Sequence, residues 1–306
     1  MTRYAWLLAT LLVVAIATTI AQSTALVVAI VRPDGYLVPF AAYANGQWER
    51  AWPAADEGTE HPTFEDTPSV WRRHGQSTPR TWHLWSGSQT KSTQVRVSGI
   101  ESVEAHCQAQ VALKTDLRPI KIDHPAKRGV AVDSDIPLTA VEEVRQSDTL
   151  WKPAERAVAT RLAELETQRA RAGGMQIPRE TPSPVVRITA LYRESRSPPS
   201  PMYFLAEKPY RTSRVPSDPQ CKAVTIMTGW LIHGDDDRLL VQTPRIFLTD
   251  CDGKGVRTAE PLAALHLSNR VFWLLQEHGY EDESYIVAEI APSGVRYRVS
   301  INGGGC

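Results

Sequence analysis

Residues 262–301 read LAALHLSNRVFWLLQEHGYEDESYIVAEIAPSGVRYRVSI, and this stretch decides the fold. It contains apolar or alternating runs that are bounded by residues favouring turns. The runs are Leu262–Leu267, Val271–Gln276, Tyr285–Ile290 and Val295–Ile301. In the last run, apolar residues alternate with Arg296, Arg298 and Ser300, which is typical of a strand with one buried and one solvated face. The stretch therefore predicts an antiparallel meander of four strands.

The segments upstream have the same character. Asp34-Gly35 and Asn45-Gly46 separate alternating apolar runs, and both dipeptides are strong hairpin signals. Thr243-Pro244 is expected to form another turn between two short strands. The predicted strands outside the first stretch are Leu26–Val31, Tyr36–Tyr43, Gln47–Trp52, Thr81–Trp85, Thr93–Val97, Val103–Leu113, Gly129–Asp133, Val185–Tyr192, Met202–Leu205, Ala223–His233, Arg238–Gln242 and Arg245–Thr249.

One helix interrupts this β pattern at about residues 152–172. Apolar residues recur there at helical spacing, at Ala154, Val158, Leu162 and Leu165. Pro153 suits the first helical turn, and the glycine pair 173–174 suits the end. The apolar stripe is narrow, so we expect a surface helix that lies on the β body.

The prediction for the fold class is therefore a mainly β protein built from antiparallel meanders with this one surface helix. A small propeller-like array is the first choice of architecture, and two packed β-sandwiches are the alternative. Residues 22–306 are expected to form a single domain, with the helix as an excursion at about 150–174 and a subdivision near 175–184 as a further option.

The first 21 residues have the pattern of an export signal peptide. Arg3 precedes an apolar run from Ala5 to Ala17, and Thr19-Ile20-Ala21 fits a small-residue cleavage site. An uncleaved anchor is the rival interpretation, because apolar residues resume at Leu26–Val31. The polar residues between the two runs argue against one continuous spanning helix of roughly 20 residues. We expect cleavage near Ala21, a secreted or periplasmic mature chain, and membrane contact only during export.

The cysteines stand at positions 107, 221, 251 and 306. Outside the cytoplasm an even cysteine count favours disulfides, and none of these residues has the spacing of a zinc site. Four cysteines permit three pairings. We prefer Cys221–Cys251 and Cys107–Cys306, because the glycines at 303–305 give the C-terminus slack to reach a partner.

Basic and acidic residues balance at 34 each, so no net charge attracts nucleic acid or an anionic membrane. The nucleophile elbow of hydrolases, the zinc-protease helix motif and the phosphate-binding loop are all missing from the sequence. Two acidic turns remain as weak catalytic candidates: Asp235 and Asp237 beside His233, and Glu281 and Glu283 near His278. A glycosidase would need two such carboxylates across a cleft, whereas adjacent carboxylates are mostly solvated.

Asp250 and Asp252 are weak candidates for a metal site. The segment from Asp250 to Gly255 begins like a calcium loop, with oxygen ligands at alternate positions and a glycine at the turn. Its twelfth position is Pro261 where a bidentate glutamate is needed, so it is not an EF-hand. A looser calcium turn is possible, but a turn anchored by a disulfide is the better interpretation, and no other cofactor is expected.

Tryptophans supply the candidate ligand-binding residues. Five of them cluster between residues 48 and 85, and flat rings on a β surface stack on sugars or on the apolar side chains of a partner. Most are expected to fill the core. Trp71, Trp82 and Trp85 are retained as candidates, and Trp71 is expected to be exposed because it lies in a polar stretch.

These observations favour an exported, disulfide-stabilised β protein that binds a ligand or has a structural role. A glycan or a component of the cell envelope is the expected class of partner. The alternative is an exported, glycan-directed hydrolase that uses the turn carboxylates. An enzyme is the less favoured of the two, because the known catalytic motifs are missing from the sequence.

Overall fold

The computed structural model describes residues 25–55, 81–85, 92–119, 129–171, 177–195, 201–213, 218–234 and 238–306. These residues form antiparallel sheets and one long helix, as the sequence predicts. The helix is α3 (Trp151–Arg171). The strands are β1 (Leu26–Val31), β2 (Leu37–Ala44), β3 (Gln47–Arg50), β4 (Thr81–Trp85), β5 (Thr93–Ala105), β6 (Gln108–Thr115), β7 (Gly129–Val132), β8 (Val141–Glu143), β9 (Arg187–Glu194), β10 (Met202–Ser213), β11 (Lys222–His233), β12 (Leu239–Thr249), β13 (Thr258–Leu267), β14 (Arg270–His278), β15 (Asp282–Ala291) and β16 (Gly294–Gly305).

The N-terminal part of the chain is a closed barrel of six strands in the order β1-β7-β4-β5-β6-β2, with β2 returning to β1. β3 extends this sheet from the far end of β2, through the hairpin turn at Asn45 and Gly46. Both turn residues have positive φ, as a two-residue hairpin requires. β1 is apolar and buried along its whole length because it packs on both of its faces.

A central four-stranded sheet, β13-β14-β15-β16, covers the barrel. Along β14, Phe272 and Leu274 pack against the barrel core, while Trp273 and Leu275 pack on the opposite side. This alternation follows from the period of two residues in a strand. The stretch that decides the fold is therefore a sheet with a hydrophobic core on each face.

An outer five-stranded sheet, β12-β11-β10-β9-β8, packs on the second face of the central sheet. Trp230 of β11 and Trp273 of β14 meet there edge to face, with ring centroids 5.0 Å apart. The other face of the outer sheet receives α3, whose buried residues include Ala154, Val158 and Leu162. The expectation of a surface helix laid on a β body is thus confirmed.

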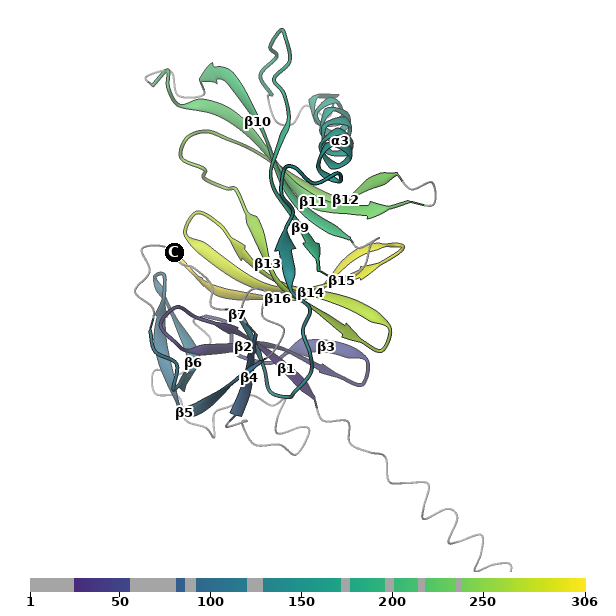
Figure 1. Cartoon of the computed structure of the whole chain (residues 1–306). Coiled ribbons are helices and arrows are strands. Elements are labelled where there is room, and N and C mark those ends of the chain that lie inside the picture. Colours follow the sequence, from purple (N-terminus) through teal and green to yellow (C-terminus); the bar gives the residue numbers. More distant parts are fainter. Residues whose placement is uncertain are drawn as a thin grey trace, which may run out of the picture.

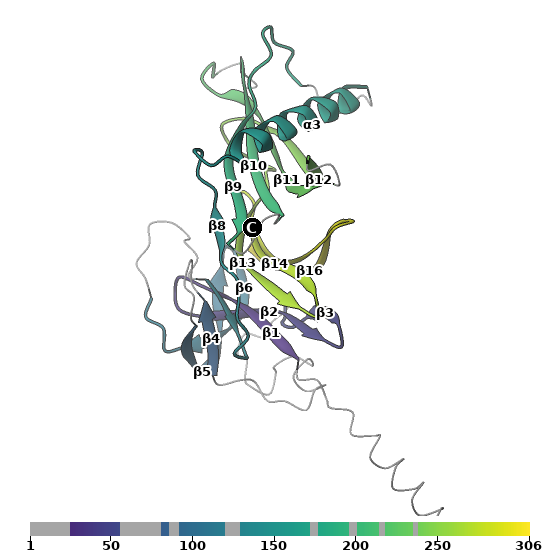
Figure 2. The same cartoon turned by 45° about the vertical axis from the view of Figure 1, so that its right-hand side comes forward.

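The layers are stacked from the barrel through the central and outer sheets to α3 (Figure 1). Figure 2 shows the same stack after a turn, with α3 lying across the outer sheet at the end far from the barrel. This arrangement differs from the propeller-like array and from a pair of sandwiches. Sequence could not show that the N-terminal strands close on themselves, because closure depends on pairings such as β1 with β7, far apart in the chain.

Two local predictions were wrong. The run Val103–Leu113 spans the end of β5, a hairpin turn at His106-Cys107 and the start of β6. That turn carries none of the usual glycine or asparagine signals, although His106 has a φ of 57°. The second wrong prediction is the turn at Thr243-Pro244: β12 runs through these residues with a shift of register against β11. In addition, the three-residue strand β8 was not predicted.

Both disulfides have the preferred pairing, Cys107–Cys306 and Cys221–Cys251. The first ties the C-terminus to the β5–β6 turn of the barrel. The second joins the start of β11 to the residues after β12. In the part of the chain that the structure describes, no helix combines the length and the apolar character needed to span a membrane.

Candidate functional site

The acidic turn between β14 and β15 separates its two candidate carboxylates. Glu281 is exposed, and its backbone carbonyl accepts a hydrogen bond from the amide of Cys306. Glu283 pairs across the hairpin with His278 and lies further inside. The two glutamates therefore do not face each other across a cleft.

Glu283 is held by two short hydrogen bonds. Gln276 donates through Nε2 and Tyr285 through its hydroxyl, each at 2.6 Å. Tyr285 is only 1% exposed, and burial together with the Glu283 carboxylate raises its pKa well above the usual value. The phenol thus stays protonated and donates to the carboxylate, which is a structural arrangement.

A cavity of about 260 Å³ lies beside Glu283, between the central sheet and two turns of the barrel. Arg32 donates hydrogen bonds from two guanidinium nitrogens to the carboxylate of Asp34, and one to the backbone carbonyl of Glu104. The Oε1 atom of Gln276, which lines the cavity, is buried without a hydrogen-bond partner among the described residues. The cavity is polar, and the side chains of Arg32, Asp34 and Glu283 are already hydrogen-bonded.

The remaining predicted residues lie apart from this cavity. Asp235, Asp237 and Trp71 are outside the described residues. Trp82 is fully buried in the barrel core, and Trp85 is half-buried. Neither ring is presented flat on an open surface, so no sugar platform is formed by these two.

Asp250 and Asp252 form a local turn, in which the carboxylate of Asp250 accepts a hydrogen bond from the amide of Asp252 at 3.2 Å. Within the described ranges, the only three potential ligands that converge are Asp250, Cys221 and Cys251. The two sulfurs are joined in a disulfide and cannot bind a metal as thiolates. Calcium binding by this turn stays a prediction.

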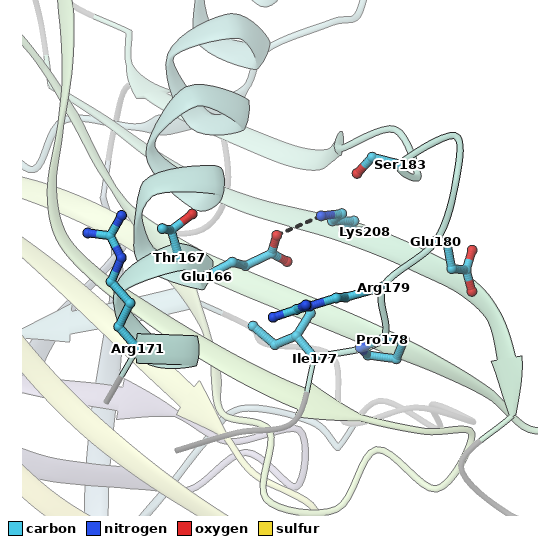
Figure 3. Close-up of a pocket in the computed structure, with 9 residues that line it drawn as sticks. All are labelled: Glu166, Thr167, Arg171, Ile177, Pro178, Arg179, Glu180, Ser183 and Lys208. Carbon is cyan, nitrogen blue, oxygen red and sulfur yellow. Dashed lines mark hydrogen bonds and ion pairs between the residues drawn. The ribbon is translucent and has the colours of Figure 1, made fainter. Parts of the chain in front are cut away.

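A larger pocket, of about 470 Å³, lies beside the end of α3 (Figure 3). It is lined by three segments: the last turns of the helix, the chain from Ile177 to Ser183, and Lys208 of β10. Figure 3 shows Arg171 at the end of the helix, Arg179 between Glu166 and Glu180, and Lys208 paired with Glu166. We call this the helix-end pocket.

Both carboxylates of the helix-end pocket, Glu166 and Glu180, accept hydrogen bonds from neighbouring residues. Glu166 accepts a hydrogen bond from Lys208 at 2.6 Å and one from the hydroxyl of Tyr210 at 2.7 Å. Burial and the bond to Glu166 raise the pKa of Tyr210, so this hydroxyl remains a donor. The negative charge of Glu166 is therefore neutralised by its neighbours.

Glu180 likewise accepts hydrogen bonds, in this case from residues of β10. Its carboxylate accepts bonds from the amides of Arg211 and Thr212, at 2.7 and 2.8 Å, and from the Thr212 hydroxyl at 2.9 Å. Desolvation by itself would raise the pKa of Glu180, but these hydrogen bonds outweigh it and the pKa is lowered. Glu180 thus stays ionised and fixes the segment that carries Arg179.

Arg171 and Arg179 form no ion pair with any described residue, and both are exposed. Two guanidinium groups that have no ionic partner among the described residues suit a carboxylate or a phosphate, because each can offer a planar pair of N–H donors. Ile177 and Pro178 add apolar surface beside them. The arrangement can therefore bind an anion.

Comparisons with protein-family models, with curated proteins and with solved structures find no match. The chemistry of the pockets is therefore the basis for any functional conclusion.

Sequence reasoning missed the helix-end pocket. Arg171 is ordinary for the last turn of a helix, where positive charge complements the helix dipole. The signal that could have indicated a pocket was the arginine at 179, five residues after the glycine pair and next to Pro178. Only the fold brings that segment against Lys208.

Proposed function

We propose that this chain is an exported, disulfide-stabilised binding protein without catalytic activity. Its contact surface is α3 with the pocket and groove beside it, which we call the α3 layer. The observation that carries this proposal is the state of the charges in the helix-end pocket. Its carboxylates are bonded to neighbours, whereas Arg171 and Arg179 have no described ionic partner. A pocket built in this way supplies binding energy to an anionic group.

Export is part of the proposal. The N-terminal sequence pattern supports it, and two disulfides with no free cysteine are compatible with an oxidising compartment. N-terminal sequencing of the protein from its native compartment tests this, and we expect the mature chain to begin near Gln22. A chain that retains residues 1–21 would contradict cleavage.

Binding is favoured over catalysis because three buried glutamates of the described chain are held in structural pairs. Glu277 binds Arg245 and Arg257, Glu289 binds Arg270 and Arg298, and Glu194 binds His266. Hydrogen bonds from Arg270 and Arg298 lower the pKa of Glu289 to about 2, so this carboxylate is a poor proton donor near neutral pH.

The binding proposal is tested with small anions and with glycans. We expect citrate, inorganic phosphate or an acidic oligosaccharide from an array to raise the melting temperature of the mature protein, and Arg179→Glu to abolish the shift. Arg187→Glu is the matched control, because Arg187 is an exposed arginine on β9 that does not line the pocket. Shifts that are equal in the two variants would contradict a role for the helix-end pocket.

The cavity beside Glu283 supports a second candidate, a glycan-directed hydrolase. It is concave, and it brings Glu283, Asp34 and Glu104 close to a buried tyrosine. If this candidate is right, Glu283→Gln abolishes hydrolysis of a glycan substrate panel while the fold survives. Absence of hydrolysis by the wild-type protein across the panel would exclude it.

A further inference from the structure

A groove runs along α3 on the side of β12. It has a volume of about 740 Å³ and is lined by one stripe of the helix and by the start of β12. The helix contributes Pro153, Arg156, Ala157, Thr160, Arg161 and Glu164, which recur at three- and four-residue spacing and therefore share a face. The strand contributes Arg238–Gln242. We call this the α3–β12 groove.

β12 is the edge strand of the outer sheet, and its hydrogen bonding can be read from the register. The amide of Gly234 donates to the carbonyl of Arg238, so these two residues form a hydrogen-bonded pair of the antiparallel ladder. Such pairs alternate along a ladder, and the next is therefore Ile232 with Leu240. It follows that the N–H and C=O groups of Leu239 and Val241 point away from β11.

An edge of this kind is a template for another strand. Further along β12 the edge is interrupted, because Pro244 lacks an N–H and the carbonyl of Ile246 accepts a bond from Arg169 of α3. The open part, from Leu239 to Gln242, spans roughly 13 Å at about 3.3 Å per residue. It is therefore limited to a short extended segment.

The side chains around this open edge indicate what kind of segment can bind there. Leu239 and Val241 pack toward the core beneath α3, and Leu240 is 46% exposed on the opposite face. The charged residues of the groove are three arginines and one glutamate, and that glutamate, Glu164, already pairs with Arg161 at 2.7 Å. Arg238 has an interaction of its own as well, so the groove combines apolar surface with the positive charge of Arg156.

We infer that the α3–β12 groove binds an extended acidic segment of a partner protein, which adds to the outer sheet as a strand beside β12. Main-chain bonds to Leu239 and Val241 fix the backbone of that segment. Its acidic side chains meet Arg156, which forms no ion pair with a described residue, and its apolar side chains pack between the helix and the strand. The inference rests on the proposed function, because it names the partner class of the same α3 layer.

A second copy of this chain fits the groove less well. Pairing β12 with its own copy across a two-fold axis would bring two sets of the same arginines together, because an isologous interface joins identical patches. Like charges placed opposite each other oppose association. An acidic segment from another protein removes this repulsion.

Fluorescence anisotropy on the mature full-length protein tests the inference. The probe is a labelled eight-residue peptide of alternating glutamate and valine, and the comparison peptides are lysine–valine and a glutamate–valine version with N-methyl groups on alternate amides. We expect the first peptide to bind, and both comparison peptides to bind at least tenfold more weakly. Added salt should weaken binding, since ion pairs at an exposed edge are screened.

Protein variants locate the site. Arg156→Glu should weaken the glutamate–valine peptide about tenfold, and Val241→Pro should do the same because it removes an outward N–H without loss of a bond to β11. Arg187→Glu on β9 carries the same change of charge and should bind normally. Unchanged binding by Arg156→Glu, or equal binding of the N-methylated peptide, would overturn strand addition in this groove.

Failure of this inference can be told from failure of the proposed function. Suppose that no peptide binds, but a small anion or a glycan still raises the melting temperature and Arg179→Glu abolishes that shift. The inference about the groove is then wrong, and the proposed binding function is still supported. A dimer that Val241→Pro dissolves would place a second copy on this edge and would also overturn the inference.

Discussion

Three glycines at the end of β16 lie where the backbone packs against other groups without room for a side chain. A Cβ at residue 303 would lie 2.7 Å from the ring of the buried Tyr285. At residue 304 it would lie 2.6 Å from the carbonyl oxygen of Ala105, and φ there is 136°. These glycines were expected only to give slack to the C-terminus. In the structure they seat the last strand against the barrel.

Gly303→Ala should therefore destabilise the protein by about 1–3 kcal/mol, as overpacking of a tight core does. Denaturant unfolding monitored by fluorescence measures the change. Gly99→Ala is the matched control: Gly99 also lies in a strand, and a Cβ there would meet its nearest neighbour at an ordinary 3.9 Å. Equal stability of the two variants would contradict the tight packing at Gly303.

Glu289 shows how single carboxylates contribute to stability. Hydrogen bonds from Arg270 lower its pKa to about 2 against the opposing effect of burial, with a further contribution from Arg298. A carboxyl whose pKa is lower in the folded protein than in the unfolded chain stabilises the fold at pH values above its unfolded pKa. That stability is lost as the pH falls from about 4.5 toward 2.

Glu289→Gln should consequently flatten the pH dependence of unfolding between pH 2 and 4.5 and lower stability at neutral pH. The measurement is a set of urea unfolding curves across this range. Glu281→Gln, at an exposed turn, controls for the loss of one negative charge. A slope unchanged from wild type would show that the arginine pair does not stabilise the folded state through Glu289.

Among the elements, α3 is the one whose position decides the proposed function. Its packing on the outer sheet sets one wall of the helix-end pocket and one wall of the α3–β12 groove. Val158 and Leu162 are fully buried against that sheet. The helix is polar elsewhere, so this stripe holds it in place.

Leu162→Ala should destabilise the protein by about 2–5 kcal/mol, because it leaves a cavity under the helix. Leu165→Ala, at a partly buried position one turn later, should cost clearly less. Thermal unfolding compares the two variants. If they are equally stable, the helix is not anchored by the buried stripe.

Most elements could be predicted from the sequence, because alternation and turn residues are local. The meander from β13 to β16, the hairpin at Asn45-Gly46 and the helix from Trp151 all follow from short-range pattern. The double burial of the central sheet was harder to foresee, since a run such as VFWLLQ in β14 shows no alternation of polarity when both faces are covered.

The sites could not be predicted in the same way. The helix-end pocket joins Arg171, Arg179 and Lys208, which are brought together only by the path of the chain after the helix. The open edge of β12 depends on which strand ends the outer sheet. The acidic residues singled out from the sequence were conspicuous through their spacing, but Glu283 turned out to be bonded on both of its oxygens.

On the scale of the whole molecule, the barrel and α3 lie in different layers, each with its own hydrophobic core. The barrel and the central sheet share one hydrophobic core, and the outer sheet and α3 share another. Cys107–Cys306 ties the C-terminus to the barrel, and Cys221–Cys251 lies within the outer layer. We therefore expect the two bonds to stabilise the protein unequally.

Replacing both cysteines of the Cys107–Cys306 bond by serine should cost about 1–2 kcal/mol more than the same change at Cys221–Cys251. The reason is the sequence separation of 199 residues against 30, since a longer closed loop restricts the unfolded chain more. Urea unfolding of the two double variants under non-reducing conditions compares them. A larger loss from Cys221–Cys251 would contradict the loop-length argument.

The claim that the α3 layer is a binding surface is tested most directly by residue-resolved amide exchange, with and without the glutamate–valine peptide. In the free protein, the outward amides of Leu239 and Val241 should exchange fast, while the amide of Leu240, bonded to β11, is already protected. Saturating peptide should slow exchange at Leu239 and Val241 at least tenfold and leave Leu240 unchanged. Uniform exchange along β12 with no change on adding peptide, or protection confined to the cavity beside Glu283, would contradict the account.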